Sequence, residues 1–185
     1  MIWDELTSSE IEAIDPAIPV ILPVAATEQH GPHLPLATDR MIGWHFAHTL
    51  HQKIPEKVLI LPSVAVGCSS HHMDFAGTLS VSHATFGAYV EEVLESVIEH
   101  NFQNLIILNS HGGNQGIGQV ILEQLGPEGP TLILITWWKL ALEGLSKITE
   151  TPVGGVGHAG EFETSLMLHI APHLVREANI EKGQN

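Results

Sequence analysis

Four apolar runs recur along the chain, and the stretches between them carry apolar residues at helical spacing. The runs cover residues 17–26, 57–67, 104–110 and 131–138. Short continuous apolar runs bounded by Pro, Gly or Asn are typical of buried strands, so we predict four strands. In the first run, the interior prolines predict either an edge strand or a short strand that begins after Pro19.

The intervening stretches predict four helices, over residues 41–54, 84–100, 114–126 and 158–172. Thr38 is a candidate N-cap for the first helix, and Ser82 or Thr85 for the second. Residues 149–157 are Gly-rich and predict a flexible linker. The alternation of strands and helices predicts an α/β fold with a doubly wound, mostly parallel sheet and helices on both faces. We find no internal repeat or boundary, and predict a single domain over residues 1–185.

Polar, chemically active side chains follow the predicted strands at the points where they end. Glu28 and His30 follow the first strand, His71 and His72 the second, and His111 the third. In open α/β sheets, binding sites form in the crevice beyond the carboxyl ends of the strands. We therefore expect these side chains to converge on one edge of the sheet.

The stretch TEQHGPHLPLATDR is unusually rich in metal-ligand side chains. Glu28 and His30 are two residues apart, so an extended backbone points both the same way. Asp39 stands at the start of a helix after a Pro-containing loop, where its two oxygens can bridge two cations. Alternatively, Asp39 is a favourable helix N-terminal charge and the histidines are solvated. The stiffening residues and the second His cluster favour the metal interpretation.

The motif NSHGGN runs from a strand into a turn that exposes His111. Gly112 and Gly113 allow a substrate or another chain segment to approach, and their N–H groups can face an oxyanion. The motif is equally compatible with a tight strand–helix turn that carries a chance histidine.

Two further motifs leave alternatives open. In SHHMDFAGTLSV, His71 and His72 either bind substrate or support other ligands, and a structural or merely exposed role is equally open. In HAGEFETS, Glu161 and Glu163 lie beside His158 in a predicted first helical turn. One of the two glutamates is expected to serve only the helix dipole.

The composition narrows the function classes. Hydrophobic residues make up 44% and charged residues 15%, which excludes a disordered chain. A net charge of −14, from 7 basic against 21 acidic residues, opposes binding to nucleic acid or anionic membrane. The first residues lack the basic and apolar regions of a signal peptide, and no apolar run spans a bilayer. The single Cys68 suits a reducing cytoplasm, where we expect the protein.

Other catalytic machineries find little support. G-x-S-x-G, G-x-x-x-x-G-K-[ST], G-x-G-x-x-G after a strand and H-E-x-x-H are all absent from the sequence. Cys68 beside His71 is a possible thiol nucleophile, although a lone Cys at a strand end is more often a buried small residue. Trp137 and Trp138 are core or interface residues, or a lid over the pocket.

Taken in order, EQHGPHLPLATD, SHHMDFAGT, NSHGGN and HAGEFETS resemble the signature segments of the creatininase family, from about Ile18 to Leu168. This family of metal-dependent amidohydrolases includes creatinine amidohydrolases, a formamidopyrimidine deformylase and a peptidase that matures a redox cofactor. The resemblance implies a doubly wound α/β fold and two divalent metal ions, of zinc, manganese or iron. It also implies a homo-oligomer, commonly a hexamer.

The resemblance also implies roles for individual residues. Glu28 and His30 would each hold a different metal, Asp39 would bridge the two, His111 would complete the first site, and Glu163 would supply the carboxylate of the second. His158 matches a histidine that handles the proton during turnover, whereas His33 has only a supporting place.

Three departures from the family pattern affect the expected substrate and fold. Gly113 stands where creatinine-hydrolysing members carry a glutamate ligand, and Gly154 stands where they carry a tryptophan. Both favour the deformylase or peptidase branches over creatinine. The chain ends at Asn185, where the family usually continues with more sheet and helix, so we expect part of the C-terminal fold to be missing.

The predicted function is hydrolysis of a C–N bond in a small amide, formamide or cyclic amide. Two divalent cations would activate a shared water. His158 would give a proton to the departing nitrogen. His71, Gly112, Gly113 and Trp138 are the predicted substrate-binding residues. The alternative is a catalytically silent binding or assembly protein that keeps the fold.

Overall fold

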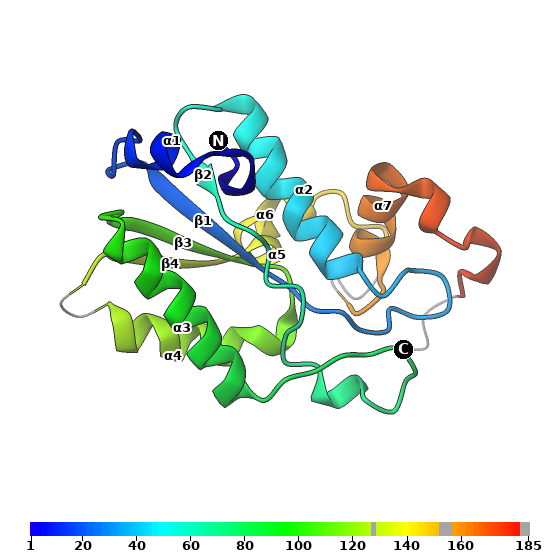
Figure 1. Cartoon of the computed structure of the whole chain (residues 1–185). Coiled ribbons are helices and arrows are strands. Elements are labelled where there is room, and N and C mark those ends of the chain that lie inside the picture. Colours follow the sequence, from blue (N-terminus) through cyan, green and yellow to red (C-terminus); the bar gives the residue numbers. More distant parts are fainter. Residues whose placement is uncertain (127–128, 152–156, 182–185) are drawn as a thin grey trace.

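A four-stranded parallel sheet in the order β2-β1-β3-β4 forms the centre of the computed structural model, which describes residues 1–126, 129–151 and 157–181. The strands are β1 (Pro19–Val24), β2 (Leu59–Ile60), β3 (Asn104–Asn109) and β4 (Thr131–Thr136), shown in Figure 1. All four strands were predicted in these places. The second is much shorter than its apolar run, and the fourth ends at Thr136 because Trp137 starts a helix.

The helices are α1 (Ser8–Glu12), α2 (Thr38–Lys53), α3 (His83–Glu99), α4 (Gln115–Leu125), α5 (Trp137–Leu140), α6 (Leu142–Leu145) and α7 (Glu161–Ile170). The described residues also contain the 3-10 turns η1 (Trp3–Glu5), η2 (Ser70–His72), η3 (Gly112–Asn114), η4 (Pro172–Leu174) and η5 (Glu177–Asn179). The four longest helices match the predicted ones. Ser82 caps α3 by accepting a hydrogen bond from the Thr85 backbone at 3.1 Å.

The predicted cap of α2 was wrong. Ala37 holds the N-cap position, and Thr38 is the first helical residue. The Thr38 hydroxyl instead donates a hydrogen bond to the Pro35 carbonyl at 2.7 Å, so it fastens the loop that precedes the helix. This contact fixes the path by which the chain enters α2, one residue before Asp39.

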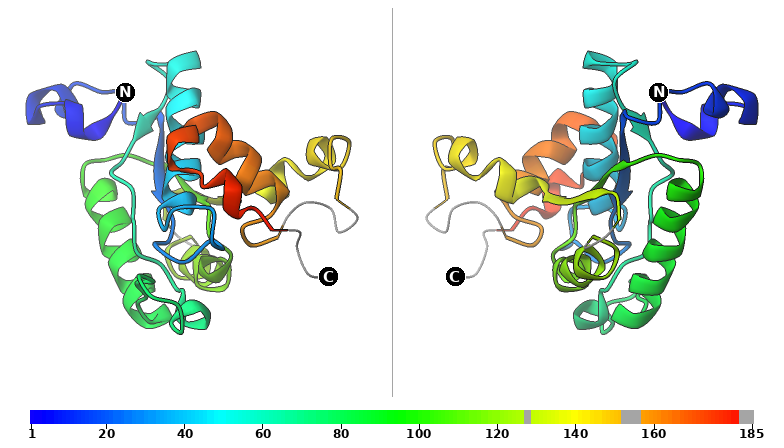
Figure 2. Two further views of the ribbon diagram at one scale, coloured as in Figure 1. Left: turned by 90° about the vertical axis from the view of Figure 1, so that its right-hand side faces the viewer. Right: turned by 90° about the vertical axis from the view of Figure 1, so that its left-hand side faces the viewer.

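Helices cover both faces of the sheet, as the doubly wound prediction requires (Figure 2). On one face, Leu22 packs in a cluster with Phe86 of α3 and Ile121 of α4. On the other face, Ile21 packs with Ala47 of α2, and α7 lies against α2. Alternate residues of β1 thus face opposite helix layers, which explains why this strand is apolar throughout.

Of the two alternatives predicted for the first run, the edge strand is wrong, since β1 lies between β2 and β3. The alternative of a short strand is close to the structure, in which β1 begins at Pro19 itself. The Pro23 carbonyl accepts a hydrogen bond from Val64 at 2.9 Å, so the backbone polar groups of Pro23 face the β2 side. The ladder to β2 covers only Leu59–Ile60 and has ended by that point. A missing N–H therefore costs no ladder hydrogen bond, and a proline is tolerated in a central strand.

The strands β1, β3 and β4 end in register, with Val24, Asn109 and Thr136 side by side. The loops that follow them consequently start at one edge of the sheet. Across the described residues, none of the helices combines the length and apolar character needed to cross a membrane.

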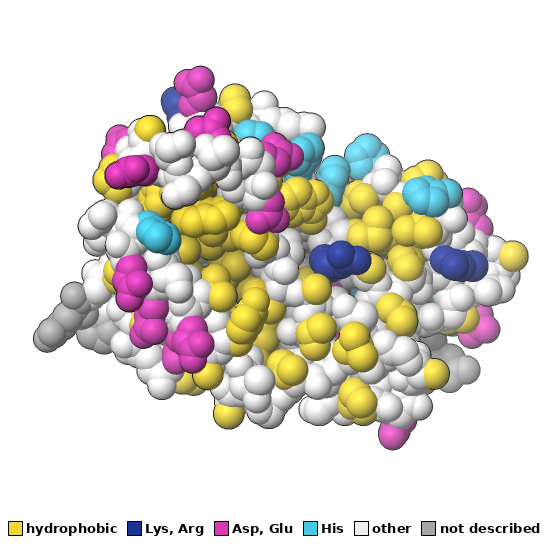
Figure 3. All heavy atoms as spheres, in the orientation of Figure 1, with side chains coloured by type: hydrophobic (Ala, Val, Ile, Leu, Met, Phe, Trp, Pro, Cys, Tyr) yellow, Lys and Arg dark blue, Asp and Glu magenta, His cyan; other side chains and the backbone are white. Residues whose placement is uncertain are grey.

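The surface carries the acidic balance of the composition. Figure 3 shows acidic side chains spread over the α3 side of one face. Apolar side chains gather on the same face between the N-terminal segment and α3. In this region Trp3, Leu6 and Ile11 pack against the main core, which attaches the N-terminal segment to the sheet.

Candidate metal centre

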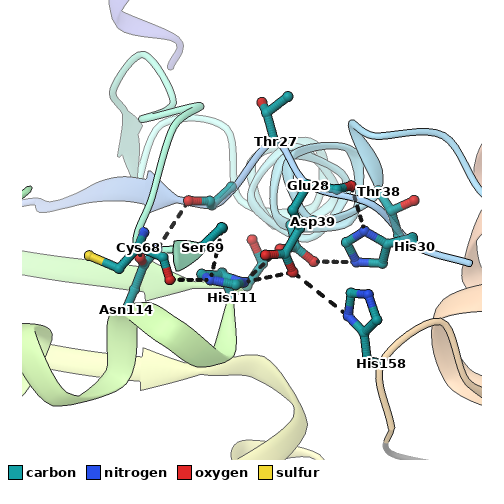
Figure 4. Close-up of polar contacts among 12 residues, drawn as sticks. Thr27, Glu28, His30, Thr38, Asp39, Cys68, Ser69, His111, Asn114 and His158 are labelled. Atoms are coloured by element: carbon teal, nitrogen blue, oxygen red, sulfur yellow. Dashed lines mark hydrogen bonds and ion pairs between the residues drawn. The ribbon is translucent and has the colours of Figure 1, made fainter. Parts of the chain in front are cut away.

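Four ionisable side chains are buried together beyond the ends of β1 and β3 (Figure 4). Glu28 and His30 follow β1, Asp39 lies in the first turn of α2, and His111 follows β3. Their exposed fractions are only 1–3%. Charged groups are almost never this buried unless they are paired or hold a metal. The predicted convergence of these residues is therefore present.

Asp39 lies between the two imidazoles, with one carboxylate oxygen toward each. Its Oδ1 is 3.1 Å from His30 Nε2, and its Oδ2 is 3.0 Å from His111 Nδ1. Glu28 Oε1 lies 3.2 Å from the same nitrogen of His111. Glu163 Oε1 approaches His30 Nε2 from α7, at 3.8 Å. Each imidazole thus faces two carboxylates, of which Asp39 is common to both.

Backbone carbonyls fix the orientation of both histidine rings. His30 Nδ1 donates to the Glu28 carbonyl at 3.1 Å, and His111 Nε2 donates to the Cys68 carbonyl at 3.1 Å. The nitrogen that faces Asp39 is in each case the other one. Metal-ligating histidines typically have this arrangement, because the outer hydrogen bond sets which nitrogen is available to the metal.

The charges of the cluster are strongly coupled. Burial opposes protonation of His30, but the hydrogen bond to Asp39 and the nearby carboxylate of Glu163 outweigh burial and raise the pKa of His30 to about 11. The same balance, with Asp39 and Glu28, raises the pKa of His111 to about 10. Burial likewise opposes ionisation of Glu28 and Asp39, yet the imidazoles hold both carboxyl pKa values below their ordinary range. The carboxylates thus favour positive charge beside them, which either protonated imidazoles or bound cations can provide.

The donor atoms fit divalent cations. Within the described part of the chain, Glu28 Oε2 is buried without a hydrogen-bond partner, and Asp39 Oδ2 faces only the imidazole of His111. Sets of three donor atoms within 4.8 Å of one another occur four times: Glu28, His30 and Asp39; His30, His158 and Glu163; Glu28, His71 and His111; and Glu28, His72 and His158. Imidazole and carboxylate ligands suit zinc, manganese and iron.

Further histidines line the open side of this cluster. The His158 ring lies 4.4 Å from the His30 ring and 4.2 Å from the His72 ring, centre to centre. Burial and the neighbouring His30 lower the pKa of His158, and burial and the neighbouring His158 lower that of His72. Both imidazoles are therefore neutral near pH 7.

A cavity of about 450 Å³ opens over the carboxylates. The predicted substrate-binding residues His71, Gly112 and Trp138 lie in its wall. Trp137 also reaches it but is 7% exposed and packs against Phe46, as a core residue does. Apolar walls over a polar floor are typical of a site for a small ligand.

Gly113 lies behind the cavity wall. A Cβ on Gly113 would come within 2.0 Å of the Cys68 carbonyl oxygen and 2.6 Å of His111 Nε2. The glycine thus allows the Cys68 loop to approach closely enough to hold His111. Gly154 lies outside the described residues.

Helix phase separates the two glutamates of α7. Glu161 accepts hydrogen bonds from the backbone N–H groups of Glu150 and Thr151, both at 2.9 Å, so it holds the preceding loop. Glu163 faces the cluster, and its second oxygen accepts from the Ala159 backbone at 2.6 Å.

His33 supports the site without joining it. Its Nε2 contacts the Thr164 hydroxyl at 2.9 Å, which ties the loop after β1 to α7. Burial raises the pKa of the Cys68 thiol, which works against the thiol-nucleophile alternative.

Two supporting residues escaped the sequence prediction. Asn114 accepts from the Cys68 backbone and donates to the Ala25 carbonyl, both at 3.0 Å, so it joins the loops after three strands. Gln29 contacts two of the histidines of the cavity. Both lie inside motifs that were recognised for their neighbours, which is the signal that could have identified them.

The parallel α/β fold and the buried His–carboxylate cluster define a candidate metallohydrolase. The chain belongs to the creatininase family, whose model, described as creatinine amidohydrolase, matches residues 4–185. It is thus a hydrolase of that family.

Individual relatives differ in what they act on. The chain is 34% identical over 185 residues to the mycofactocin precursor peptide peptidase of Mycobacterium tuberculosis, covering 96% of this chain and 67% of the relative. It is 29% identical over 189 residues to the creatinine amidohydrolase of Pseudomonas putida, covering 92% and 72%. A solved structure described as "Creatininase Mn" matches with a TM-score of 0.84 at 25% identity, covering 99% and 77%.

Gly113→Ala is expected to destabilise the fold, because its Cβ meets the Cys68 carbonyl and cannot be accommodated without moving that loop. The expected loss is about 1–3 kcal/mol in the free energy of unfolding, measured by urea denaturation. Gly112→Ala is the control, since nothing lies within 4 Å of its Cβ, and it should stay within about 0.5 kcal/mol of the parent. Equal losses for both variants would contradict this account of Gly113.

Metal binding is expected to release protons. His30 and His111, with pKa values of about 11 and 10, are protonated at pH 7 and must lose a proton to become ligands. Metal affinity should therefore weaken as the pH falls. Calorimetric titration with Zn²⁺ in buffers of different ionisation enthalpy should give about two protons released per fully loaded chain. The exposed-residue variant His173→Gln should release the same number, and no release at all would contradict the assignment.

Proposed function

We propose that this site binds two divalent metal ions, of zinc, manganese or iron, and hydrolyses a C–N bond of an amide, formamide or cyclic amide. The observation that carries the proposal is Asp39, whose two oxygens each face a different buried imidazole. A carboxylate in that position is suited to bridge two cations.

The candidate ligands form two sets of three residues that share Asp39. Glu28, Asp39 and His111 would hold one cation, and His30, Asp39 and Glu163 the other. Each cation would have three protein ligands, as catalytic metal sites commonly do. Divalent cations held there would supply an activated water near neutral pH and would polarise the substrate carbonyl. The "Creatininase Mn" structure supports manganese as one candidate.

The residues of the chain have the remaining tasks. Glu28, Asp39 and Glu163 balance the charge of the cations. His158 and Glu163 border the cavity, where an imidazole and a carboxylate can serve the departing amide nitrogen, which leaves poorly when unprotonated. Trp138 and Phe162 line the cavity with apolar surface and exclude water from the reacting atoms.

The substrate class rests on size and on the relatives. A cavity of about 450 Å³ suits a small amide or the end of a short peptide. The similarity to a peptide peptidase supports the end of a short peptide as the substrate. The similarity to a creatinine amidohydrolase supports a cyclic amide as the substrate. The silent-protein alternative is less favoured, because a complete buried donor set without function would only cost stability. A cytoplasmic location and a homo-oligomer, with a hexamer as one form, stay predictions.

Asp39→Asn is expected to abolish both metal retention and hydrolysis, because an amide cannot bridge two cations as a carboxylate does. Divalent metal should fall to trace levels by mass spectrometry. Hydrolysis in a screen of small amides, formamides, lactams and short peptides should fall by more than about 100-fold, the upper range for loss of a mere supporting residue.

The matched control for this experiment is Asp4→Asn, an exposed residue of η1 that should retain both metal and activity. Parent protein that holds no divalent metal above trace would refute the two-metal proposal. Retained activity in Asp39→Asn would refute the bridging role.

A further inference from the structure

The amide of Gln29 has its orientation fixed by its own loop. Gln29 Oε1 accepts a hydrogen bond from the Gly31 backbone N–H at 2.8 Å. A backbone N–H can only donate, so the atom that it contacts must be the amide oxygen. The reversed amide would place two donors against each other. The position of the Gln29 nitrogen is therefore settled by chemistry.

This nitrogen contacts two histidines at once. Gln29 Nε2 lies 3.0 Å from His72 Nδ1 and 2.9 Å from His158 Nε2. An amide nitrogen carries two hydrogens and accepts nothing, so both ring nitrogens must be acceptors without a proton. A neutral imidazole then carries its proton on the other nitrogen, which is Nε2 in His72 and Nδ1 in His158.

Both of these N–H groups face the carboxylate floor of the cavity. His158 Nδ1 lies 3.7 Å from Glu28 Oε1, and His72 Nε2 lies 4.0 Å from the same oxygen. The two rings are stacked at 4.2 Å with 23° between their planes, so the N–H groups lie side by side. A ring nitrogen that carries a proton cannot bind a cation. The donor set of Glu28, His72 and His158 is thereby closed to a third metal.

We propose that Gln29 is a positioning residue that holds His72 and His158 as N–H donors toward the substrate carbonyl oxygen. The inference rests on the proposed amide hydrolysis. Within that reaction it assigns hydrogen-bond donation to the two histidines and proton transfer to another group. His158 has no lone pair toward the cavity in this tautomer, so it does not take the proton of the attacking water. It stabilises the negative charge that develops on the carbonyl oxygen, as oxyanion-hole donors do.

The proton of the attacking water must then pass to a carboxylate. Glu163 borders the cavity, and its Oε1, which faces His30, is the oxygen that would hold a cation. Its Oε2 accepts from the Ala159 backbone N–H and has a second lone pair that can take this proton. The carboxylate passes this proton to the departing nitrogen as the C–N bond breaks. Glu163 ends the cycle ionised, as it began, and the products are a carboxylic acid and an amine.

Gln29→Glu replaces the hydrogen-bond donor that faces the two histidines with an acceptor, without changing the size of the side chain. A carboxylate only accepts hydrogen bonds, so it still accepts from Gly31 but now requires N–H groups from the two rings. The expected tautomers are therefore Nδ1–H in His72 and Nε2–H in His158, with lone pairs toward Glu28. Gln52→Glu, which adds the same charge at an exposed position of α2, is the matched control.

The test is a long-range ¹H–¹⁵N correlation spectrum of zinc-loaded protein labelled at histidine, with His72→Gln and His158→Gln variants for assignment. Protonated and unprotonated ring nitrogens have well-separated ¹⁵N shifts. The parent and Gln52→Glu should show unprotonated Nδ1 in His72 and unprotonated Nε2 in His158, and Gln29→Glu should show the reverse. Gln29→Glu should also lower kcat with little change in KM, because only the transition state loses its donors.

The parent spectrum decides the proposal even if Gln29→Glu does not fold. Opposite tautomers, or rings protonated on both nitrogens in the parent at pH 7, would overturn it whatever the activity. An unchanged kcat in a folded Gln29→Glu with reversed tautomers would overturn the role in the reaction. The predicted tautomers in a protein that hydrolyses no amide would refute the proposed function and leave the tautomer assignment standing.

Discussion

The contact of Asp39 with two buried imidazoles is the interaction on which the site depends. It joins the loop after β1, the first turn of α2 and the loop after β3 in a single charge network. None of these charged groups would be stable in the interior alone, because an unpaired buried charge costs several kcal/mol. Their mutual arrangement therefore requires the strand ends to meet and α2 to start where it does. The fold places the network, and the network in turn holds the strand-end loops together.

The sequence predicted much of this fold because parallel sheets follow simple rules. Continuous apolar runs identified the strands, and the carboxyl-end rule brought Glu28 and His111 to one edge. Predictions from local sequence rules failed where neighbouring segments of the folded chain changed the conditions that the rules assume. The proline rule places Pro23 at a sheet edge, but the ladder between β1 and β2 ends at Ile60, and beyond it Pro23 contributes only its carbonyl, which accepts from Val64. The apolar run of β4 also hid the start of α5 at Trp137, since periodicity alone does not separate a strand from a short helix.

The sequence motifs supplied the candidate ligands. They did not show which ring nitrogen of each histidine faces the carboxylates, or which residues support the ligands. The resemblance already implied Glu163 as a ligand, and the folded chain brings it to the cluster. The role of Glu161 in holding the preceding loop required the coordinates. Gln29 gains its significance from His72 and His158, which are 43 and 129 residues away along the chain. No pattern within one segment of the sequence shows that these three residues meet. The hydrogen bonds between them, and their donors and acceptors, could therefore not be predicted from the sequence.

The space around Gly113 bears on how such sites can change during evolution. The resemblance implies a carboxylate ligand at this position in creatinine-hydrolysing members, yet here the Cys68 carbonyl oxygen would lie only 2.0 Å from a Cβ. A single substitution to glutamate would strike the backbone that holds His111. The segment around Cys68 would have to shift before a glutamate at position 113 could be tolerated, so substitutions in two separate segments would be needed. This dependence of one substitution on another is epistasis. Substitutions in the loops that wall the cavity do not have this requirement and are the simpler way to a new specificity.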